Sequence, residues 1–573
     1  MTVAPRPFQP LPPAADRLAM PDQNLTAPFR DPAAPGLTPP RTRAASRVFV
    51  FLAPLCAALV LTGLWIGGFT RDGRLTWVEA ALAGLSGFAF FWMALSVANA
   101  LLGLFWKPPP RIHPLHGLKV AILLPMYGEP AHETISAAMR LLAGLSGQGR
   151  HGFSLHVLSD TRSASAAQRE EAAVSAARRR HPGLALTYRR RARNSDYKSG
   201  NIRDWVTSEG HAHDAMLILD ADSVMGPESV LRMADAMALD PGVGLIQTTP
   251  RLLAGTTVWQ GLQSFASEVY GRNMGRGFAL WTGNEGNFLG HNALVRVRAF
   301  AASAGLPHLS GAAPRGGVIL SHDFVEAALL RRAGWGVQMM PEAEDSHEDT
   351  PPALVGYLKR DQRWCQGNLQ HIRLLRMPGL HPVSRFHLLQ GAMAYLSALL
   401  WPLLLLLWAL HGHAATAVST VPPLIQGGTA GLVILTLMAP KLLGILAHLR
   451  HPGLSLAAAP RFAGLVLAEI ALSALLAPAL MVQQARAVLR ILQGRDGGWM
   501  PHETGLSTLR TLLRFHAVET ALGAGLISLS ALGQGNLWLL PIGISLALTV
   551  PLAALAQMPR AAFTRRPAME TPA

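Results

Sequence analysis

Long apolar stretches near both ends of the chain predict membrane-spanning helices. Each approaches or exceeds the roughly 20 residues that a helix needs to cross a bilayer, and short polar segments separate them. The predicted spans are 48–69, 77–106, 387–410, 431–449, 517–532 and 537–556. The pattern is that of a polytopic α-helical membrane protein whose spans lie on both sides of a long central region.

The central region, from about residue 117 to 365, consists of short apolar runs separated by amphipathic stretches. Helical periodicity over 131–145 and 164–180 separates the first of these runs, which is the rhythm of βαβ units. The runs predicted to be strands are 120–124, 155–158, 184–188, 216–219 and 243–247. We therefore expect an α/β domain with a mostly parallel sheet.

Two further segments have weaker patterns. Residues 1–47 are rich in Pro and Ala and lack long apolar runs, which predicts disorder and argues against a cleaved signal peptide. Residues 369–387 mix Arg373, Arg376 and Arg385 with Leu, Ile and Phe. This mixture predicts an amphipathic helix at the membrane surface, with an ordinary solvated helix as the alternative.

The segment 464–482 is ambiguous. It is apolar but contains Glu469 and Pro478, and basic residues flank it on both sides. A single crossing would place one basic flank outside the cell, against the usual charge asymmetry of membrane proteins. Either the segment dips into the bilayer and returns, or it forms a broken pair that extends to Leu492.

These patterns divide the chain into consecutive parts. They are a disordered tail (1–47), a pair of spans (48–106), the α/β domain (115–368), an interface helix (369–387), a second pair of spans (388–449), an ambiguous membrane segment with a possible gating loop (462–512), a last pair of spans (513–557) and a terminal tail (558–573).

Charge orients this arrangement. Hydrophobic residues make up 50% of the chain and charged residues 15%, with a formal net charge of +16. Arg and Lys concentrate outside the first two spans, so the α/β domain and both termini are predicted to be cytoplasmic. The basic residues flank apolar segments, which favours a lipid bilayer over nucleic acid as the partner. The 2 cysteines, Cys56 and Cys365, supply neither a disulfide framework nor a zinc site.

The strongest chemical signal is a run of apolar residues that ends in two acids, Asp220 and Asp222. On a strand, residues two apart point to the same side, and ligands of open α/β sheets bind at the carboxyl ends of strands. Two carboxylates there suit Mg²⁺ or Mn²⁺ holding a diphosphate. The alternative is a strand followed by a capped helix. Neither a P-loop nor a dinucleotide-binding motif occurs in the region.

The order of motifs resembles a known family. Asp160 stands alone after a strand, Asp220 and Asp222 follow, Asp323 opens a helix, and Arg363-Trp364 precedes the predicted interface helix. This order resembles the processive, membrane-embedded family-2 glycosyltransferases, which include cellulose, hyaluronan and chitin synthases. The stretches 290–293, 321–324, 363–368 and 379–385 resemble the glucosyltransferases that make osmoregulated periplasmic glucans. Arg360 stands where the wider family usually has Gln.

The resemblance implies a GT-A-like fold, an inner-membrane location and a role for each motif residue. The implied donor is UDP-glucose and the implied acceptor is a growing glucan, with a periplasmic glucan-processing protein as a further partner. The implied donor-binding residues are Tyr127, Glu129, Asp160, Lys198, Asp220 and Arg363; the metal ligands are Asp220 and Asp222; Asp323 is the catalytic base; Trp364 and His291 bind the acceptor.

Several alternatives stay open at this point. Asp323 can be a helix cap with Glu326 as its partner, Lys198 a surface lysine, and His291 a core histidine. The arginine runs 178–180 and 189–191 are predicted to be surface. The glycine-rich stretch 493–502 is either a gate over the donor or an inert connector. For the whole protein, the alternatives are a nucleotide-regulated transporter without transfer activity and a polyprenyl-phosphate glycosyltransferase.

Overall fold

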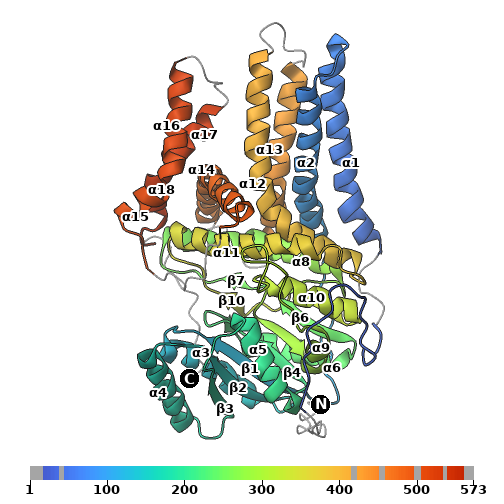
Figure 1. Cartoon of the computed structure of the whole chain (residues 1–573), viewed down its shortest axis with the longest axis vertical. Helices are drawn as coiled ribbons and strands as arrows, with labels where there is room; N and C mark the ends of the chain where they lie inside the picture. The colour runs from blue at the N-terminus through green and yellow to red at the C-terminus, as the bar shows by residue number, and fades with distance from the viewer. Residues whose placement is uncertain are drawn as a thin grey trace.

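The computed structural model describes residues 17–37, 44–414, 423–450, 459–495, 505–532 and 539–560. It contains an α/β domain below and long helices that rise from one side of it (Figure 1). The α/β domain is built on a seven-stranded sheet with strand order β3-β2-β1-β4-β8-β6-β9. The strands are β1 (Lys119–Met126), β2 (Gly152–Ser159), β3 (Leu186–Arg190), β4 (Ala215–Ile218), β6 (Val243–Thr248), β8 (Ala293–Arg296) and β9 (Gly336–Met340).

The predicted mostly parallel sheet is confirmed, and β8 is its antiparallel member. The five strands predicted from the apolar runs correspond to β1, β2, β3, β4 and β6. The sequence pattern did not identify β8 or β9, which are short and follow irregular loops. In the sheet, β2 lies beside β1 and β3 lies beside β2, whereas β4 lies on the other side of β1. The order of the strands therefore reverses between β1 and β4, which is where open sheets bind ligands.

Helices cover both faces of the sheet because alternate strand residues point to opposite sides. On β1, Val120 and Ile122 pack with α3 (Ala131–Ser146) and α6 (Pro227–Leu239). Ala121 and Leu123 pack on the other face. The helices of that second face are α5 (Tyr197–Ser208), α9 (Val297–Ser303) and α10 (His322–Ala333). The helix α4 (Ala164–Arg180) has the predicted bounds.

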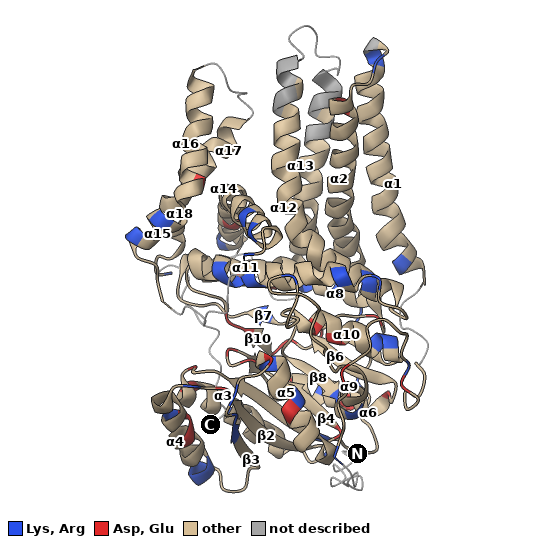
Figure 2. Ribbon diagram, in the orientation of Figure 1, with Lys and Arg blue, Asp and Glu red and all other residues tan. Residues whose placement is uncertain are grey.

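A helical platform separates the α/β domain from the rising helices (Figure 1). It contains α8 (Arg272–Thr282) and α11 (Leu354–Gln370), with α7 (Val258–Ala266) beneath the last membrane helices. A small second sheet of β5 (Val224–Met225), β10 (Ser346–Glu348) and β7 (Arg251–Leu252) supports it. Lys and Arg residues gather on α8, α11 and α15 at this level, and the rising helices carry few charges (Figure 2).

Within the described residues, five helices are long and apolar enough to cross a membrane. Many of their large apolar side chains are exposed to the surroundings, among them Leu59, Val60 and Leu467. Lipid-facing positions account for such exposure. The five helices are α1 (Ala44–Phe69), α2 (Trp77–Gly103), α12 (Pro382–Ala414), α13 (Pro423–Leu449) and α14 (Ala459–Leu492).

The predicted interface helix at 369–387 does not exist as one element. Its first residues end α11, a 3₁₀ turn follows at His371–Leu374, and α12 begins at Pro382. Pro378 and Pro382 account for the break, because proline lacks the amide hydrogen that a helix interior needs. Between them Gly379 adopts a φ of +77°, which favours glycine. The helix on the platform is instead α11, which carries Arg363 and Trp364.

The ambiguous segment is one continuous helix, α14, and forms neither a returning loop nor a broken pair. Figure 1 shows it running almost along the line of sight, unlike α12 and α13. Near its start Phe462 packs against Phe265 of α7, with ring centroids 5.7 Å apart. In its middle Leu476 packs with α7 and α11, and near its end Ile491 packs with Cys365 of α11. The helix therefore lies on the platform for much of its length.

One break precedes the first of the last two predicted spans, 517–532, and another interrupts the second, 537–556. Helix α15 (Leu509–Phe515) meets α16 (Ala517–Ala531) at an angle of 63°. The partner segment divides into α17 (Leu540–Ala547) and α18 (Thr549–Ala556). Pro551 explains this second break, since it leaves the carbonyl group of Ala547 without its helical donor.

The N-terminal segment contradicts the expectation of disorder in its described part. Residues 17–37 have no regular secondary structure but lie against α5, α10 and β9. The segment buries Met20, Gln23 and Asp31, each with an exposed fraction of 6%. Hydrogen bonds to the domain replace the secondary structure that its prolines prevent. Residues 1–16, 38–43 and 561–573 of the predicted tails, and residues 496–502 of the proposed gate with Trp499, lie outside the described residues, whereas residues 44–47 begin α1.

Candidate active site

The residues predicted to bind the donor follow the ends of three neighbouring strands. Tyr127 and Glu129 follow β1, Asp160 follows β2, and Asp220 and Asp222 follow β4. The backbone amide of Asp160 donates to Met126 O at 2.8 Å, so the first two loops lie side by side. Glu129 turns back to accept a hydrogen bond from the Tyr127 amide. Burial raises the pKa of Glu129, and the negative charge of Asp220 adds to the shift. The three loops form one acidic edge.

Lys198 connects this edge to the loop before β8. It lies in the first turn of α5 and forms an ion pair with Asp220. The same ammonium group donates to Gly290 O at 2.7 Å. The two residues before it, Asp196 and Tyr197, have φ values of 57° and 52°, an unusual conformation for residues with side chains. This strained turn aims Lys198 into the site, so the surface-lysine alternative is wrong.

Asp323 lies on the other side of Gly290. It occupies the first turn of α10 and is partly buried. A side-chain carbon built onto Gly290 would lie 3.4 Å from Asp323 Oδ2, and Gly290 itself has a φ of +93°. Burial raises the pKa of Asp323 above the usual aspartate value, against the opposing charge of His322. The N-cap residue of α10 is Ser321, whose side chain makes no capping hydrogen bond, so Asp323 is not at the N-cap position.

The next turn of α10 supports this end of the helix. His322 Nδ1 lies 3.0 Å from Glu326 Oε1. Burial alone would lower the pKa of His322, but the pair with Glu326 raises it above the usual value. Glu326 is therefore a partner of His322. Its other oxygen, Oε2, is buried and has no hydrogen-bond partner among the described residues.

Asp222 lies within a mixed cluster of charges. Burial raises its pKa to about 6, and the negative charge of Asp220 contributes, whereas His291 and Arg360 oppose the shift. His291 Nε2 lies 3.0 Å from Glu348 Oε2, a pairing that both the acceptor-binding role and the core-histidine alternative allow. Burial lowers the pKa of His291, but the hydrogen bond with Glu348 and the charge of Asp220 raise it overall. Several partly buried charges thus surround the second acid.

Helix α11 places the Arg-Trp motif beside this cluster. The guanidinium carbon of Arg360 lies 4.7 Å from the centroid of the Trp364 ring, a cation–π contact. Trp364 is 44% exposed and offers a flat apolar face. Burial lowers the pKa of Arg363, and the charge of Arg360 adds to this effect. Arg360 therefore brings positive charge near Asp222, and Arg363 lies one helical turn further along α11.

The structure corrects the interpretation of the second arginine run. Arg189, Arg190 and Arg191 lie on or beside β3; Arg189 and Arg191 are partly buried, whereas Arg190 is exposed as predicted. Arg189 binds Asn201, Arg190 Nε donates to Thr161 O at 2.9 Å, and Arg191 binds Asp160. Sequence reasoning missed these partners, and Glu348, because the signals were single charged residues in loops whose spatial neighbours come from elsewhere in the chain.

The donor set fits a hard divalent cation. Asp220 and Asp222 offer carboxylate oxygens, which Mg²⁺ and Mn²⁺ prefer. In this arrangement Lys198 already supplies a positive charge to Asp220. Among the described residues, no group of three His, Cys, Asp or Glu side chains forms a complete metal site. Two carboxylates without a third protein ligand are the arrangement expected when a substrate diphosphate completes the coordination.

Comparisons with known proteins identify the family. The profile of the family described as glycosyl transferase family group 2 matches residues 215–438. A glucans biosynthesis glucosyltransferase H from Vibrio cholerae is 40% identical over 511 residues, which cover 84% of this chain and 71% of the relative. One from Rhodopseudomonas palustris is 39% identical over 592 residues, which cover 96% of this chain and 80% of the relative.

Solved structures show a lower similarity. A mannosyltransferase from Pyrobaculum calidifontis, in complex with GDP-Man and Mn²⁺, has a TM-score of 0.42 and 16% identity, covering 66% of this chain and all of that one. A glucosyl-3-phosphoglycerate synthase from Mycobacterium tuberculosis has a TM-score of 0.27 and 15% identity, covering 46% and 82%.

The acidic strand ends, the topology of the sheet and the family profile define a family-2 glycosyltransferase with a GT-A-like domain among apolar helices. The relatives narrow this class further. The chain belongs to the glucans biosynthesis glucosyltransferase H family. Its activity is glucosyl transfer in glucan biosynthesis.

Proposed function

We propose that the chain transfers glucose from UDP-glucose to a growing β-glucan, with inversion at the anomeric carbon and with Mg²⁺ or Mn²⁺ bound to Asp220 and Asp222. The observation that carries this proposal is that the donor-side acids and Asp323 meet at the same backbone segment, Gly290. Lys198 joins Asp220 to Gly290, and Asp323 lies against Gly290. Asp220 and Asp222, the acids proposed for the diphosphate, therefore lie close to Asp323, the acid proposed for the acceptor.

The residues have complementary tasks in this reaction. Asp323 accepts the proton of the attacking sugar hydroxyl as the new bond to C1 forms, a contribution of typically 10²–10⁴-fold. Lys198, Arg363 and Arg360 offset the negative charge that develops on the departing nucleoside diphosphate. A divalent cation held by Asp220 and Asp222 would add to this stabilisation. One base and no carboxylate nucleophile give a single displacement, and hence inversion.

Trp364 and His291 are proposed to hold the acceptor. An exposed indole face suits the apolar C–H side of a sugar ring, and Trp364 presents such a face beside Arg360. His291 with Glu348 supplies polar groups for sugar hydroxyls. Tyr127, Glu129 and Asp160 form the far end of the acidic edge and are proposed to bind the nucleoside.

The membrane helices are proposed to place this reaction on the cytoplasmic side of the inner membrane and to conduct the glucan outward. The basic residues at the platform support this orientation, because Arg and Lys concentrate on the cytoplasmic side (Figure 2). A periplasmic glucan-processing protein would receive the product. A polyprenyl-phosphate glycosyltransferase does not need an Arg-Trp motif on a helix beneath so many spans, so we rank that alternative lower.

The direct test incubates the purified protein with several radiolabelled nucleotide sugars and Mg²⁺, followed by linkage analysis of any polymer. We expect glucan from UDP-glucose, no product in EDTA, and no product from Asp222→Asn. Glu171→Gln is the matched control, since Glu171 is an exposed carboxylate on α4. Full activity in EDTA would remove the metal from the mechanism. Nucleotide binding without any product would favour the transporter alternative.

A further inference from the structure

Residues 17–37 bind along the outer side of the α/β domain and are called the N-terminal strap here. The strap approaches the domain closely: a side-chain carbon built onto Gly305 would lie 2.0 Å from Pro21 O. The Gln23 amide donates to Gly305 O at 2.9 Å, and the Gln23 side chain donates to Ala302 O at 3.0 Å. Because these backbone groups are in close contact and hydrogen-bonded, the strap backbone is held in one position on the domain.

The strap completes the environment of a buried arginine at the end of α10. Arg332 is 5% exposed, and the strap provides its acceptors. Its guanidinium donates to Asn24 O at 3.0 Å and to Gln23 Oε1 at 2.9 Å. Close by, Trp335 Nε1 donates to Asp31 Oδ2 at 2.9 Å. Without the strap, a buried cation would lose these acceptors, which is costly in a poorly solvated environment.

The strap also holds α5. Arg203 forms an ion pair with Asp22, with Nη1 and Oδ1 2.7 Å apart, and donates to Met20 O at 3.1 Å. Met20 is buried in the same apolar cluster as Ile202 and Trp205 of α5. One segment of the chain therefore contacts both α5 and α10.

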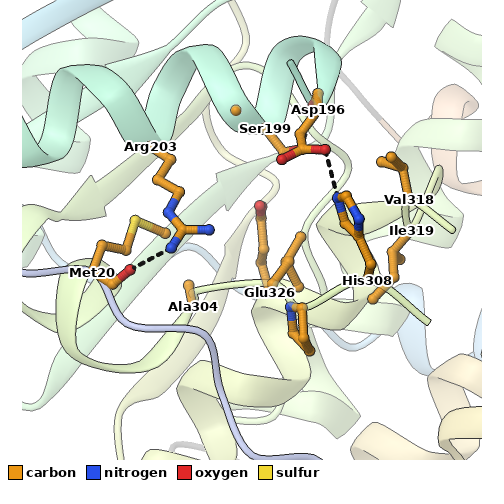
Figure 3. Close-up of a pocket in the computed structure, with 12 residues that line it drawn as sticks. Met20, Asp196, Ser199, Arg203, Ala304, His308, Val318, Ile319 and Glu326 are labelled. Atoms are coloured by element: carbon orange, nitrogen blue, oxygen red, sulfur yellow. Dashed lines mark hydrogen bonds and ion pairs between the residues drawn. The ribbon is translucent and has the colours of Figure 1, made fainter. Parts of the chain in front are cut away.

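These two helices carry the reacting ends of the site. Lys198 lies in the first turn of α5, and Asp323 lies in the first turn of α10. Between the helices lies a pocket lined by Ser199 and Arg203 on one side and Glu326 on the other, with Met20 at its edge (Figure 3). Direct packing does not fill this space, so the separation of the two helices depends on what bridges them. Two elements bridge them: α9, which packs in one apolar cluster with both helices, and the strap.

We propose that the N-terminal strap positions the catalytic ends of α5 and α10, with Arg203 and Arg332 as the positioning residues through which it acts. This inference rests on the proposed function, in which Asp323 is the base and Lys198 contacts the diphosphate site. A small displacement of a reacting group lowers the rate strongly. The strap therefore sets the turnover number through Asp323, and through Lys198 it also contributes to the affinity for the donor.

The test loosens the strap from both sides in the full-length chain. On the domain side, Gly305→Ala adds one methyl group where Pro21 O lies. On the strap side, Asp22→Ala and Gln23→Ala remove the contacts with Arg203 and Arg332. Thr26→Ala is the matched control, because the Thr26 side chain bonds only Asn24 within the strap. We expect kcat to fall roughly ten- to a hundredfold in the loosened variants. In Gln23→Ala, which acts on α10 through Arg332, the KM for UDP-glucose should change less than roughly twofold. Asp22→Ala, which frees α5, should also raise this KM, and Thr26→Ala should behave as wild type.

A double-mutant cycle separates positioning from general support. If the strap acts by placing Asp323, the loosened variants should lose little further rate in an Asp323→Asn background. Gln23→Glu should restore turnover relative to Gln23→Ala, because it returns an acceptor to Arg332. Unchanged kcat in all loosened variants, or equal losses in both backgrounds that follow a lower folded fraction, would overturn the proposal.

The proposed function can be disproved independently of the strap proposal. Wild-type turnover by Asp323→Asn alone would remove the base assignment. In that case a kcat loss in the loosened variants would still support positioning through Lys198, and its absence would overturn the strap as well. Melting curves of each variant in detergent show whether a loss of rate follows a loss of folded protein.

Discussion

Arg191 holds both carboxylate oxygens of Asp160, from Nε to Oδ1 at 2.6 Å and from Nη2 to Oδ2 at 2.8 Å. The two side chains have exposed fractions of 7% and 6%. Two parallel hydrogen bonds of this kind fix the plane of the carboxylate as well as its position. Asp160 is therefore presented in one orientation at the edge where the nucleoside is proposed to bind.

The first prediction concerns this pair. Arg191→Gln should leave a buried carboxylate without its cation, a change that costs about 3–5 kcal/mol. The KM for UDP-glucose should rise at least roughly tenfold while kcat changes less, since the nucleoside is bound equally before and during transfer. Arg193→Gln, at an exposed position two residues on, is the control. Equal KM values for the two variants would show that the Arg191–Asp160 pair does not contribute to donor binding.

The second prediction distinguishes the two kinds of acid. Asp323→Asn should leave the binding of UDP-glucose nearly unchanged and lower the transfer rate by roughly 10²–10⁴-fold, as expected for a removed base. Asp222→Asn should weaken Mg²⁺-dependent nucleotide binding itself. One calorimetric titration and one turnover assay measure both effects. Near wild-type polymer synthesis by Asp323→Asn would move the base to another residue, with Glu285 and Glu326 the next to test.

The third prediction is a pH dependence. Asp323 must be ionised to accept a proton, and burial raises its pKa, so kcat should fall as pH falls through a value above the ordinary 3.8. The charge of His322 opposes that shift. His322→Gln should therefore move the acid limb of the kcat profile to higher pH. His132→Gln, at an exposed position on α3, should leave the profile in place.

The profile should be measured at saturating UDP-glucose and Mg²⁺, so that ionisation of the donor site does not limit the rate. A limb that moves to lower pH in His322→Gln, or does not move, would contradict the electrostatic coupling between the two residues. Loss of activity at all pH values with an unchanged limb would mean that His322 supports only the structure of α10.

Sequence patterns predicted the α/β domain because its strands are buried on both faces and read as short apolar runs. The D-x-D motif could be placed for the same reason, since Asp220 follows such a run directly. Arg191 and Glu348 could not be placed, because their partners Asp160 and His291 are distant in sequence. The strap was missed because its stability comes from the acceptors that it offers to Arg332 and Arg203, and its own composition resembles a disordered tail.

For the apolar helices, the sequence predicts which segments are long enough to cross a membrane but not how each is oriented. Apolar length identified α1, α2, α12 and α13 but could not give the direction of α14, which depends on contacts with the platform. Apolar residues pack equally well against lipid and against α7 or α11. The orientation of such a helix therefore becomes visible only when its partners are known.

The last prediction concerns the sidedness of α14. Because the helix lies on the platform from Phe462 to Ile491, both of its ends should face the cytoplasm. This placement also keeps both basic flanks on one side, as the positive-inside rule favours. With Cys56 and Cys365 replaced, single cysteines at Arg461 and Arg495 should be labelled from the same side of the membrane as Thr26 of the strap. A cysteine at Leu75, between α1 and α2, should be labelled from the opposite side and serves as the reference. Arg461 and Arg495 on opposite sides would show that α14 crosses the bilayer, and the helices after it would then be inverted relative to this proposal.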